Sequence, residues 1–281
     1  MNAATLAGRD LATLADDMEA LAYADLYAAA PPFVKASLGL EVLTLAGATL
    51  LLAPRLPVPM FNRVIGVGLR RPADLDTIDA IAEIYRRQGS ASWWLHWNPY
   101  AAPSDLAEQL PKLGFTQPAR RSWAKMARGR QAPPAIPTDL EIVPVVTERA
   151  EQVTLAITQA FAMPPIMAAW LQQLHGRPRW HLYEIAEQGR SVGGGCLFVS
   201  GECAWLGMGG VLESHRRRGG QGALMARRIT DAIALGAQQI VTETGEAIGA
   251  EPNPSLANMR RCGFSLAASR LNFARNATEQ R

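Results

Sequence analysis

The chain has 281 residues, which predicts two domains at roughly 150 residues each. Hydrophobic residues make up 48% of the chain and charged residues 19%, which is enough apolar material for a packed core and excludes a disordered protein. The 24 glycines and 19 prolines follow no period, which excludes a collagen-like chain, and a net charge of +3 is too small to indicate nucleic-acid binding by itself.

The first half predicts alternating strands and helices. Apolar residues recur on one face of residues 73–87, as in an amphipathic helix. The aromatic run Trp93, Trp94, His96 and Trp97 alternates along a strand and fills both of its faces, which indicates core packing or an interface between the halves. The predicted elements are strands at 41–45, 49–53, 63–67, 93–97 and 121–126 and helices at 73–87 and 103–113.

The second half repeats this order after a proline-rich stretch. Prolines remove backbone donors and disfavour helix, so residues 131–138 are expected to be a linker. Gly114-Phe115 and Gly263-Phe264 precede the last strand of each half, which indicates one fold used twice, in domains 1–130 and 139–281. The predicted elements are strands at 180–185, 192–199, 204–211, 239–242 and 267–274 and helices at 221–235 and 254–262.

Cysteine usage and hydropathy bear on the compartment. Three cysteines without zinc-type spacing indicate neither a disulfide framework nor a metal site. The start of the chain lacks a basic segment followed by an apolar run, so no secretory signal is expected. The most apolar stretch, residues 38–53, carries Glu41 and is shorter than the ~20 residues that span a bilayer. We therefore expect a cytoplasmic protein with no metal and no membrane association.

The glycine- and arginine-rich loop at residues 216–222, RRRGGQG, lies between a predicted strand and a predicted helix. Glycines let the backbone approach a ligand, and the free N–H groups and dipole of a helix start favour an anion. Arginines would add charge-assisted bonds to phosphate. The loop therefore predicts an anion site, with a solvated basic turn as the alternative. Neither the GxGxxG nor the GxxxxGK[ST] phosphate motif occurs here.

Residues 211–225, VLESHRRRGGQGALM, resemble the pyrophosphate-binding segment of the GNAT superfamily of acyl-CoA-dependent N-acetyltransferases, whose pattern is Q/R-x-x-G-x-G/A. One register matches this pattern literally at Arg217, Gly220 and Gly222. The other begins at Arg216 and Gly219 and places Gln221 where the family has Gly or Ala. We prefer the second register, because Leu224 and Met225 then fall where the helix buries its first apolar residues.

A second segment, residues 255–264, resembles the family's Asn-containing helix that ends in Gly-Phe. The resemblance implies an α/β fold of tandem GNAT-like domains, each with a mixed, mostly antiparallel twisted sheet flanked by helices. The first domain lacks the loop and would be a degenerate copy. By this resemblance acetyl-CoA is the co-substrate, and the residues that bind it are Met208, Gly209, Gly210, Val211, Arg216, Arg217, Arg218, Gly219, Gly220, Gln221, Gly222 and Asn258.

The resemblance further implies that a primary amine of a small molecule or peptide attacks acetyl-CoA directly in a ternary complex. A backbone N–H within residues 208–211 would stabilise the oxyanion, and Gly209-Gly210 would leave room for the pantetheine chain or mark a bulge. Glu243 is the first candidate for the general base and Glu246 the second. Met259 stands where the family often has a Tyr that acts as the general acid. Because Met has no proton to donate, Ser255 or solvent is expected to act as the acid.

Two other functions stay open. Met259 in place of a Tyr also fits a non-catalytic, regulatory CoA-binding module. Nucleic-acid binding by the three arginines rests on charge alone and predicts a steep salt dependence; we expect no such partner. The apolar residues 163–167 with Trp170 hint at a hydrophobic amine, and the chain is expected to be a monomer or homodimer. A glutamate in place of Gly220 is expected to face the diphosphate and abolish CoA binding.

Overall fold

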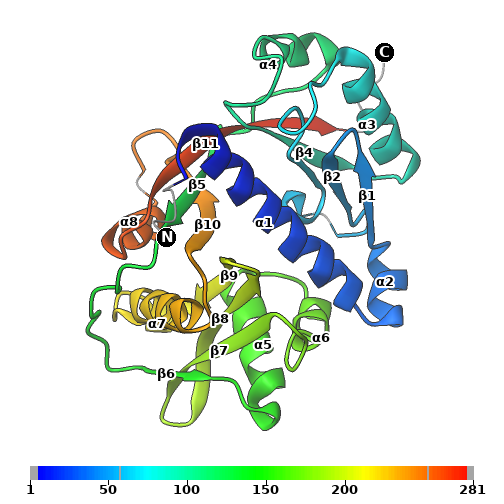
Figure 1. The fold of residues 1–281 in the computed structure, drawn as a ribbon. Coiled ribbons are helices and arrows are strands. Elements are labelled where there is room, and N and C mark those ends of the chain that lie inside the picture. The colour runs from blue at the N-terminus through cyan, green and yellow to red at the C-terminus, as the bar shows by residue number, and fades with distance from the viewer. Residues whose placement is uncertain (1–5, 57, 252, 277–281) are drawn as a thin grey trace.

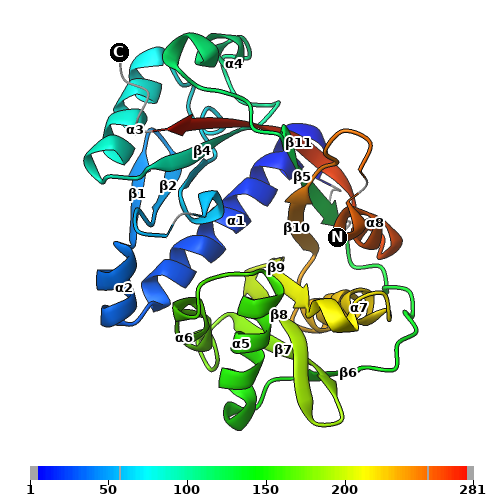
Figure 2. The ribbon, with the colours of Figure 1, turned by 180° about the vertical axis from the view of Figure 1, so that it is seen from behind.

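The computed structural model describes residues 6–56, 58–251 and 253–276. Their strands form one continuous sheet in the order β1-β2-β3-β4-β11-β5-β10-β9-β8-β7-β6. The sheet is mixed and open, and helices lie on both of its faces (Figures 1 and 2). This confirms the predicted α/β class. No helix among the described residues is long and apolar enough to cross a membrane.

The first half begins with a long helix that lies outside the predicted elements. Helix α1 buries a stripe of small and aromatic side chains, among them Ala15, Ala22 and Tyr23, against the sheet. The elements of this half are α1 (Gly8–Ala29), α2 (Pro32–Leu38), β1 (Glu41–Leu45), β2 (Ala48–Leu52), η1 (Pro59–Phe61), β3 (Arg63–Ile65), α3 (Leu75–Arg87), β4 (Ser92–Trp97), α4 (Leu106–Gln109), η2 (Leu110–Leu113) and β5 (Ser122–Arg128).

The second half repeats the order of strands and helices with longer strands in the same sheet. Its elements are β6 (Glu141–Pro144), η3 (Thr147–Arg149), α5 (Ala150–Ala160), α6 (Ile166–Gln172), β7 (Trp180–Glu187), β8 (Arg190–Ser200), β9 (Cys203–Val211), η4 (Glu213–His215), α7 (Gly220–Ala234), β10 (Gln239–Gly245), α8 (Pro254–Arg261) and β11 (Ser265–Asn276). Parallel pairs occur at equivalent places in the two halves, β3 with β4 and β9 with β10, whereas the other neighbours are antiparallel.

The closing strands of the two halves are exchanged. Strand β11 pairs with β4 of the first half, and β5 pairs with β10 of the second. The two closing strands also pair with each other, with a bulge between Leu266 and Ala268. Figure 1 shows β11 crossing from the neighbourhood of α8 to the sheet of the first half. The halves are therefore joined through the middle of one sheet as well as through the linker.

Three hydrophobic cores cover the sheet. One packs α1, α2, α5 and α6 against a face shared by both halves, and it contains Trp170 and Trp205. On the opposite face, α3 packs in the first half and α7 with α8 in the second. Trp93 and Trp97 are buried in the first-half core, where Trp93 stacks on Tyr85 with ring centroids 4.3 Å apart. Core packing is thereby confirmed for Trp93 and Trp97, whereas His96 contacts the second half, with Nδ1 at 2.8 Å from Oδ1 of Asn272.

Candidate functional site

An opening separates β9 from β10 toward their carboxyl ends. The two parallel strands are paired from Gln239 with Cys203 as far as Thr242 with Leu206, and no pairing between them is present beyond that point in the described residues. Strand β10 instead continues beside β5 to Gly245. Residues 207–211 of β9 thus have a free edge, where an extended ligand can add like a further strand.

A cavity of about 540 Å³ lies at this opening. It lies between the end of α5, strand β9, the start of α7 and helix α8, and the loop before α7 forms one wall. Of the predicted acetyl-CoA-binding residues, the ones that line it are Gly209, Gly210, Val211, Arg216, Arg217, Gly219, Gly220, Gln221, Gly222 and Asn258. The two sequence segments about 40 residues apart are therefore brought to one site.

The first turn of α7 presents unsatisfied donors at this cavity. Gly219 has a φ of 81°, which suits glycine, and caps the helix without a side-chain hydrogen bond. The backbone N–H groups of Gly220, Gln221 and Gly222 have no acceptor among the described residues, whereas the N–H of Ala223 donates to the carbonyl of Gly219. Free N–H groups at a helix start are the feature that binds phosphate.

The side of Gly220 that would carry a side chain faces the core rather than the cavity. A Cβ there would lie 2.8 Å from Cδ1 of Leu140 and 3.6 Å from Cγ2 of Ile185. The expectation that a glutamate at this position would face the diphosphate is therefore wrong. Gly220 brings its backbone to the cavity, and its missing side chain makes room for apolar neighbours.

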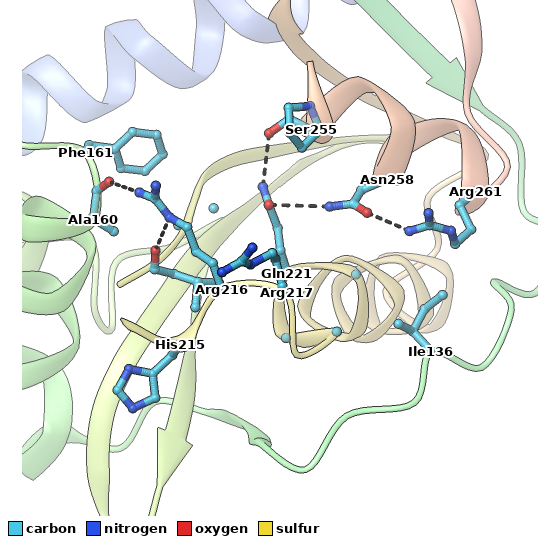
Figure 3. Close-up of a pocket in the computed structure, with 17 residues that line it drawn as sticks. Ile136, Ala160, Phe161, His215, Arg216, Arg217, Gln221, Ser255, Asn258 and Arg261 are labelled. Atoms are coloured by element: carbon cyan, nitrogen blue, oxygen red, sulfur yellow. Dashed lines mark hydrogen bonds between the residues drawn. The ribbon is translucent and has the colours of Figure 1, made fainter. Parts of the chain in front are cut away.

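The three arginines of the loop have different surroundings. Arg216 donates to the carbonyls of Val211 and Ala160, as Figure 3 shows, so its charge is not neutralised. Arg217 is exposed, lines the cavity and makes no ion pair with a described residue. Arg218 does not line the cavity, because it pairs with two carboxylates, those of Asp139 and Glu187. The loop thus directs two of its three positive charges to the cavity.

Gln221 links α7 to α8 across the cavity wall (Figure 3). Its Nε2 donates to Oγ of Ser255 at 3.2 Å, and its Oε1 accepts from Nδ2 of Asn258 at 3.5 Å. Asn258 in turn accepts from Arg261 at 2.7 Å. A glutamine is accommodated where the resembling family has Gly or Ala because its side chain leaves the loop toward α8.

Strand β9 carries a bulge beside the opening. Met208 has a φ of 52°, and the register against β8 shifts between Gly194 and Cys196. Gly209 and Gly210 are also closely packed: a Cβ on Gly209 would lie 2.9 Å from Nη2 of Arg228, and one on Gly210 would lie 3.0 Å from the Cβ of Ala160. Close packing and a bulge therefore account for these two glycines, in addition to any room that they leave for a ligand.

Arg228 of α7 is buried directly beneath this bulge. Its Nη1 donates to the carbonyls of Cys196 at 2.9 Å and Gly207 at 3.0 Å. No carboxylate among the described residues pairs with it. Burial lowers the pKa of Arg228 to about 10, so it remains a cation at neutral pH.

A second cavity, of about 150 Å³, shares Phe161, Gly209, Gln221 and Ser255 with the first. It passes through the opening from α7 and α8 to the face covered by α1. Its wall includes Glu243, the first candidate base, together with Met208 and Met259. The two cavities are therefore adjacent, with Ser255 at their boundary.

Glu243 presents one free carboxylate oxygen. Its Oε2 accepts from Nε1 of Trp205 at 2.8 Å and from Nζ of Lys125 at 3.1 Å. Its Oε1 has no hydrogen-bond partner among the described residues. Burial, and then the negative charge of Glu19, raise the pKa of Glu243 above its ordinary value against the opposing effect of Lys125. A raised pKa suits a carboxylate that takes up a proton near neutral pH.

Glu243 belongs to a buried cluster of charges. Glu19 is its centre: the carboxylate lies 2.7 Å from Arg270, 2.7 Å from Arg63 and 2.8 Å from Lys125. Burial alone would raise the pKa of Glu19, but these three cations hold it well below its ordinary value. The cluster consists of the carboxylates Asp16, Glu19 and Glu243 and the cations Arg63, Lys125 and Arg270.

Several expected or functional residues lie elsewhere than the sequence indicates. Glu246 lines neither cavity and accepts a hydrogen bond from Ser269. Trp170 is buried, and its Nε1 donates to the carbonyl of Leu26 at 2.7 Å, so it does not form an acceptor pocket. Residues of the small cavity that no sequence pattern indicates include Tyr23, Arg63, Trp123 and Arg228. The sequence does hold one indication of this region: Asp16 and Glu19 lie on the apolar stripe of α1. Carboxylates on a buried face need partners of opposite charge, so their position indicates a buried charge cluster.

The chain is similar to the structure of a GCN5-related N-acetyltransferase from Kribbella flavida, with 19% identity, a TM-score of 0.59 and coverage of 84% of this chain and 89% of that one. The fold is that of the GNAT acetyltransferases. The predicted GNAT resemblance and the tandem arrangement are thereby confirmed, the latter by a tandem GNAT protein from the clavulanic acid biosynthesis pathway with 17% identity, a TM-score of 0.59 and coverage of 83% and 79%.

A GCN5-related N-acetyltransferase from Sphaerobacter thermophilus is also similar, with 21% identity, a TM-score of 0.60 and coverage of 76% and 72%. No protein-family model and no curated protein matches the sequence. At these identities the likeness concerns the fold and not the chemistry.

Proposed function

We propose that the protein is an N-acetyltransferase that transfers the acetyl group of acetyl-CoA to a primary amine. The observation that carries the proposal is the junction of two cavities: one presents free helix N–H groups and unneutralised arginines, and the other presents a buried carboxylate with a free oxygen. Ser255 lies on the wall of both. Such a junction can hold an anionic carrier and an amine beside each other.

The residues present fit acetyl-CoA. The amides at the start of α7 and the Arg216 and Arg217 charges would hold its diphosphate, and the free edge of β9 would hold its extended arm. When bound, acetyl-CoA supplies an acetyl group activated as a thioester. Holding two reactants in place can contribute roughly 7–11 kcal/mol toward lowering a barrier.

Glu243 is the base in this proposal. A primary amine is mostly protonated at neutral pH and must lose a proton before it can attack. The free Oε1 of Glu243 accepts that proton, while Trp205 and Lys125 hold Oε2 and fix the orientation of the carboxylate. On the other side of the junction, the hydroxyl of Ser255 can donate a proton to the departing thiolate of CoA. Met259 cannot do so, because it has no proton to donate.

The test measures free thiol released from acetyl-CoA across a panel of primary amines, with acetyl-CoA binding measured in parallel by calorimetry. We expect amine-dependent release in the wild type, and release that is about 10²–10⁴-fold slower in Glu243→Gln, which keeps the shape of the side chain. Glu246→Gln is the matched control, because Glu246 lines neither cavity. Wild-type protein that binds acetyl-CoA tightly yet releases no thiol with any amine would contradict the proposal.

The alternative is a CoA-binding module without turnover. It is favoured by Met259, whose side chain is buried in the wall of the small cavity where a proton donor would be useful. This alternative would be supported if acetyl-CoA raised the melting temperature of the protein and no amine caused release of free thiol.

A further inference from the structure

The small cavity is built by both halves of the chain. Helix α1, strand β3 and strand β5 of the first half contribute Tyr23, Arg63 and Trp123, and β10 of the second half contributes Glu243. At about 150 Å³ it equals the share of roughly five water molecules. This is room for a small polar molecule or for the polar end of a larger one.

Two donors of the first half have neither a hydrogen bond nor an ion pair with any described residue. The side chain of Arg63 is 1% exposed, and its Nε is buried without a hydrogen-bond partner among the described residues. The same is true of Nε1 of Trp123. Arg63 is otherwise engaged: Nη1 lies 3.4 Å from Nε2 of His96, and Nη2 lies 2.7 Å from Oε1 of Glu19.

Unsatisfied donors of this kind are costly. A buried polar group without a partner costs about 1–3 kcal/mol, and native structures contain few of them. Here two occur on residues that line the same cavity. A bound molecule toward which these two side chains turn would give both donors an acceptor.

The charges around the cavity indicate what kind of acceptor this is. The buried cluster has three carboxylates and three cations, so it is neutral while Glu243 is ionised. Burial and the positive charges of Arg270 and Arg63 lower the pKa of His96 well below its ordinary range, so it adds no charge. Arg228 also lines the cavity and has no carboxylate partner among the described residues, so the region already carries a net positive charge. A lone ammonium ion would add to that charge, whereas a molecule with one ammonium and one carboxylate would leave it unchanged.

We propose that the small cavity binds the acceptor as an amino acid, with its ammonium group at Glu243 and its carboxylate at the free donors of Arg63 and Trp123. This deepens the proposed function and rests on it for the role of the amine. Charge-assisted bonds to a guanidinium are about twice as strong as neutral ones, so the carboxylate determines which amines are selected. The first half of the chain thereby sets the specificity of a reaction whose acetyl donor is held by the second.

The experiment compares matched pairs of small acceptors: glycine with methylamine, and β-alanine with ethylamine. Glycinamide keeps an acceptor oxygen without the charge. Thiol release from acetyl-CoA gives kcat/KM, and calorimetry in the presence of CoA gives the affinity for each compound without turnover. The variant is Trp123→Phe, which removes one donor and keeps an aromatic ring. Trp94→Phe is the control, because Trp94 packs against Trp123 with ring centroids 6.3 Å apart but does not line the cavity.

We expect the amino acids to exceed their matched amines by about tenfold or more in kcat/KM and in affinity, with glycinamide between them. Trp123→Phe should lose about tenfold for the amino acids and little for the amines, and Trp94→Phe should resemble the wild type. Equal kcat/KM and equal affinity of the wild type for the amino acids and their matched amines would overturn the inference while leaving the acetyltransferase proposal intact.

If no compound releases thiol, the proposed reaction fails for these acceptors, and the calorimetric comparison still decides the inference. Binding of glycine or β-alanine that Trp123→Phe weakens supports the carboxylate site. Absence of binding by either amino acid overturns it. Should Trp123→Phe not fold, the comparison of acids with amines on the wild type decides alone.

Discussion

Replacement of Arg228 by methionine tests whether a buried charge serves stability or chemistry. The wild-type side chain donates to the carbonyls of Cys196 and Gly207 and has no carboxylate partner among the described residues. Burial lowers its pKa to about 10. For a cation, a lowered pKa means that the folded state disfavours the charged form, so the penalty is present at every pH below about 10 and disappears above the unfolded pKa.

The opposing contributions of Arg228 nearly cancel. At about 1.4 kcal/mol per pH unit, the lowered pKa corresponds to roughly 3 kcal/mol of destabilisation at neutral pH. The two hydrogen bonds to Cys196 and Gly207 contribute about 1.5–3 kcal/mol each, or about 3–6 kcal/mol together, and the third, from Nε to the carbonyl of Leu224, is long at 3.4 Å and adds little. Arg228→Met is therefore expected to lower the free energy of unfolding by no more than about 3 kcal/mol.

The effect of Arg228→Met on turnover is expected to be larger than this stability change suggests. Nη2 of Arg228 lies 2.9 Å from where a Cβ on Gly209 would be. At roughly 5 Å and an effective dielectric constant of about 20, a cation stabilises a developing negative charge by about 3 kcal/mol, or roughly 100-fold in kcat. The variant and Arg227→Met, a control on the exposed side of the same helix, would be compared by urea unfolding and by thiol release.

A loss of more than about 5 kcal/mol in Arg228→Met would show that the carbonyl contacts outweigh the burial penalty, contrary to this reasoning. Full kcat in the folded variant would equally refute the electrostatic role. The expected pattern is a modest change in stability with a large change in kcat, and neither change in Arg227→Met.

Three further predictions follow from the site. The kcat/KM of the wild type should fall as the pH is lowered through the raised pKa of Glu243, because the base must be ionised, and Glu243→Gln should be about 10²–10⁴-fold slower with no such pH limb. Arg217→Glu should fold normally and weaken acetyl-CoA binding about tenfold by calorimetry, since a charge reversal acts on an exposed interaction worth up to about 1 kcal/mol. Arg71→Glu is its control, because Arg71 is exposed in the first half and lines neither cavity. Gly220→Ala should lower stability by about 1–3 kcal/mol in urea unfolding through overpacking against Leu140, with little change in acetyl-CoA affinity.

Local signals were sufficient to predict the elements around the loop. The predicted helix at 221–235 is observed as Gly220–Ala234, because its apolar stripe and flanking glycines are contained in the segment itself. The hairpin at 41–45 and 49–53 is observed within one residue for the same reason. The loop also appears in the cavity wall as expected, apart from Arg218, whose partners Asp139 and Glu187 are distant in sequence.

Long-range relationships could not be predicted in this way. The position of α1 over the opening depends on contacts such as that between Glu19 and Lys125, which are 106 residues apart. Trp123 and Arg63 have ordinary strand patterns, and their unsatisfied donors become visible only when the neighbouring elements are in place. The fact that a side chain at position 220 would point at Leu140 likewise could not be predicted, because Leu140 belongs to the segment after the linker.

The exchange of closing strands explains why the two halves can share one active region. Strand β5 carries Trp123 and Lys125 from the first half directly beside β10, so that Lys125 is opposite Glu243 in the register. In the reverse direction, β11 brings Arg270 to Glu19 of α1. If each closing strand had stayed in its own half, the proposed base would lack its Lys125 partner and the small cavity would lack its Trp123 donor. In the proposed reaction, the half without the loop of residues 216–222 therefore retains a role, because it supplies the groups that orient the base and select the acceptor.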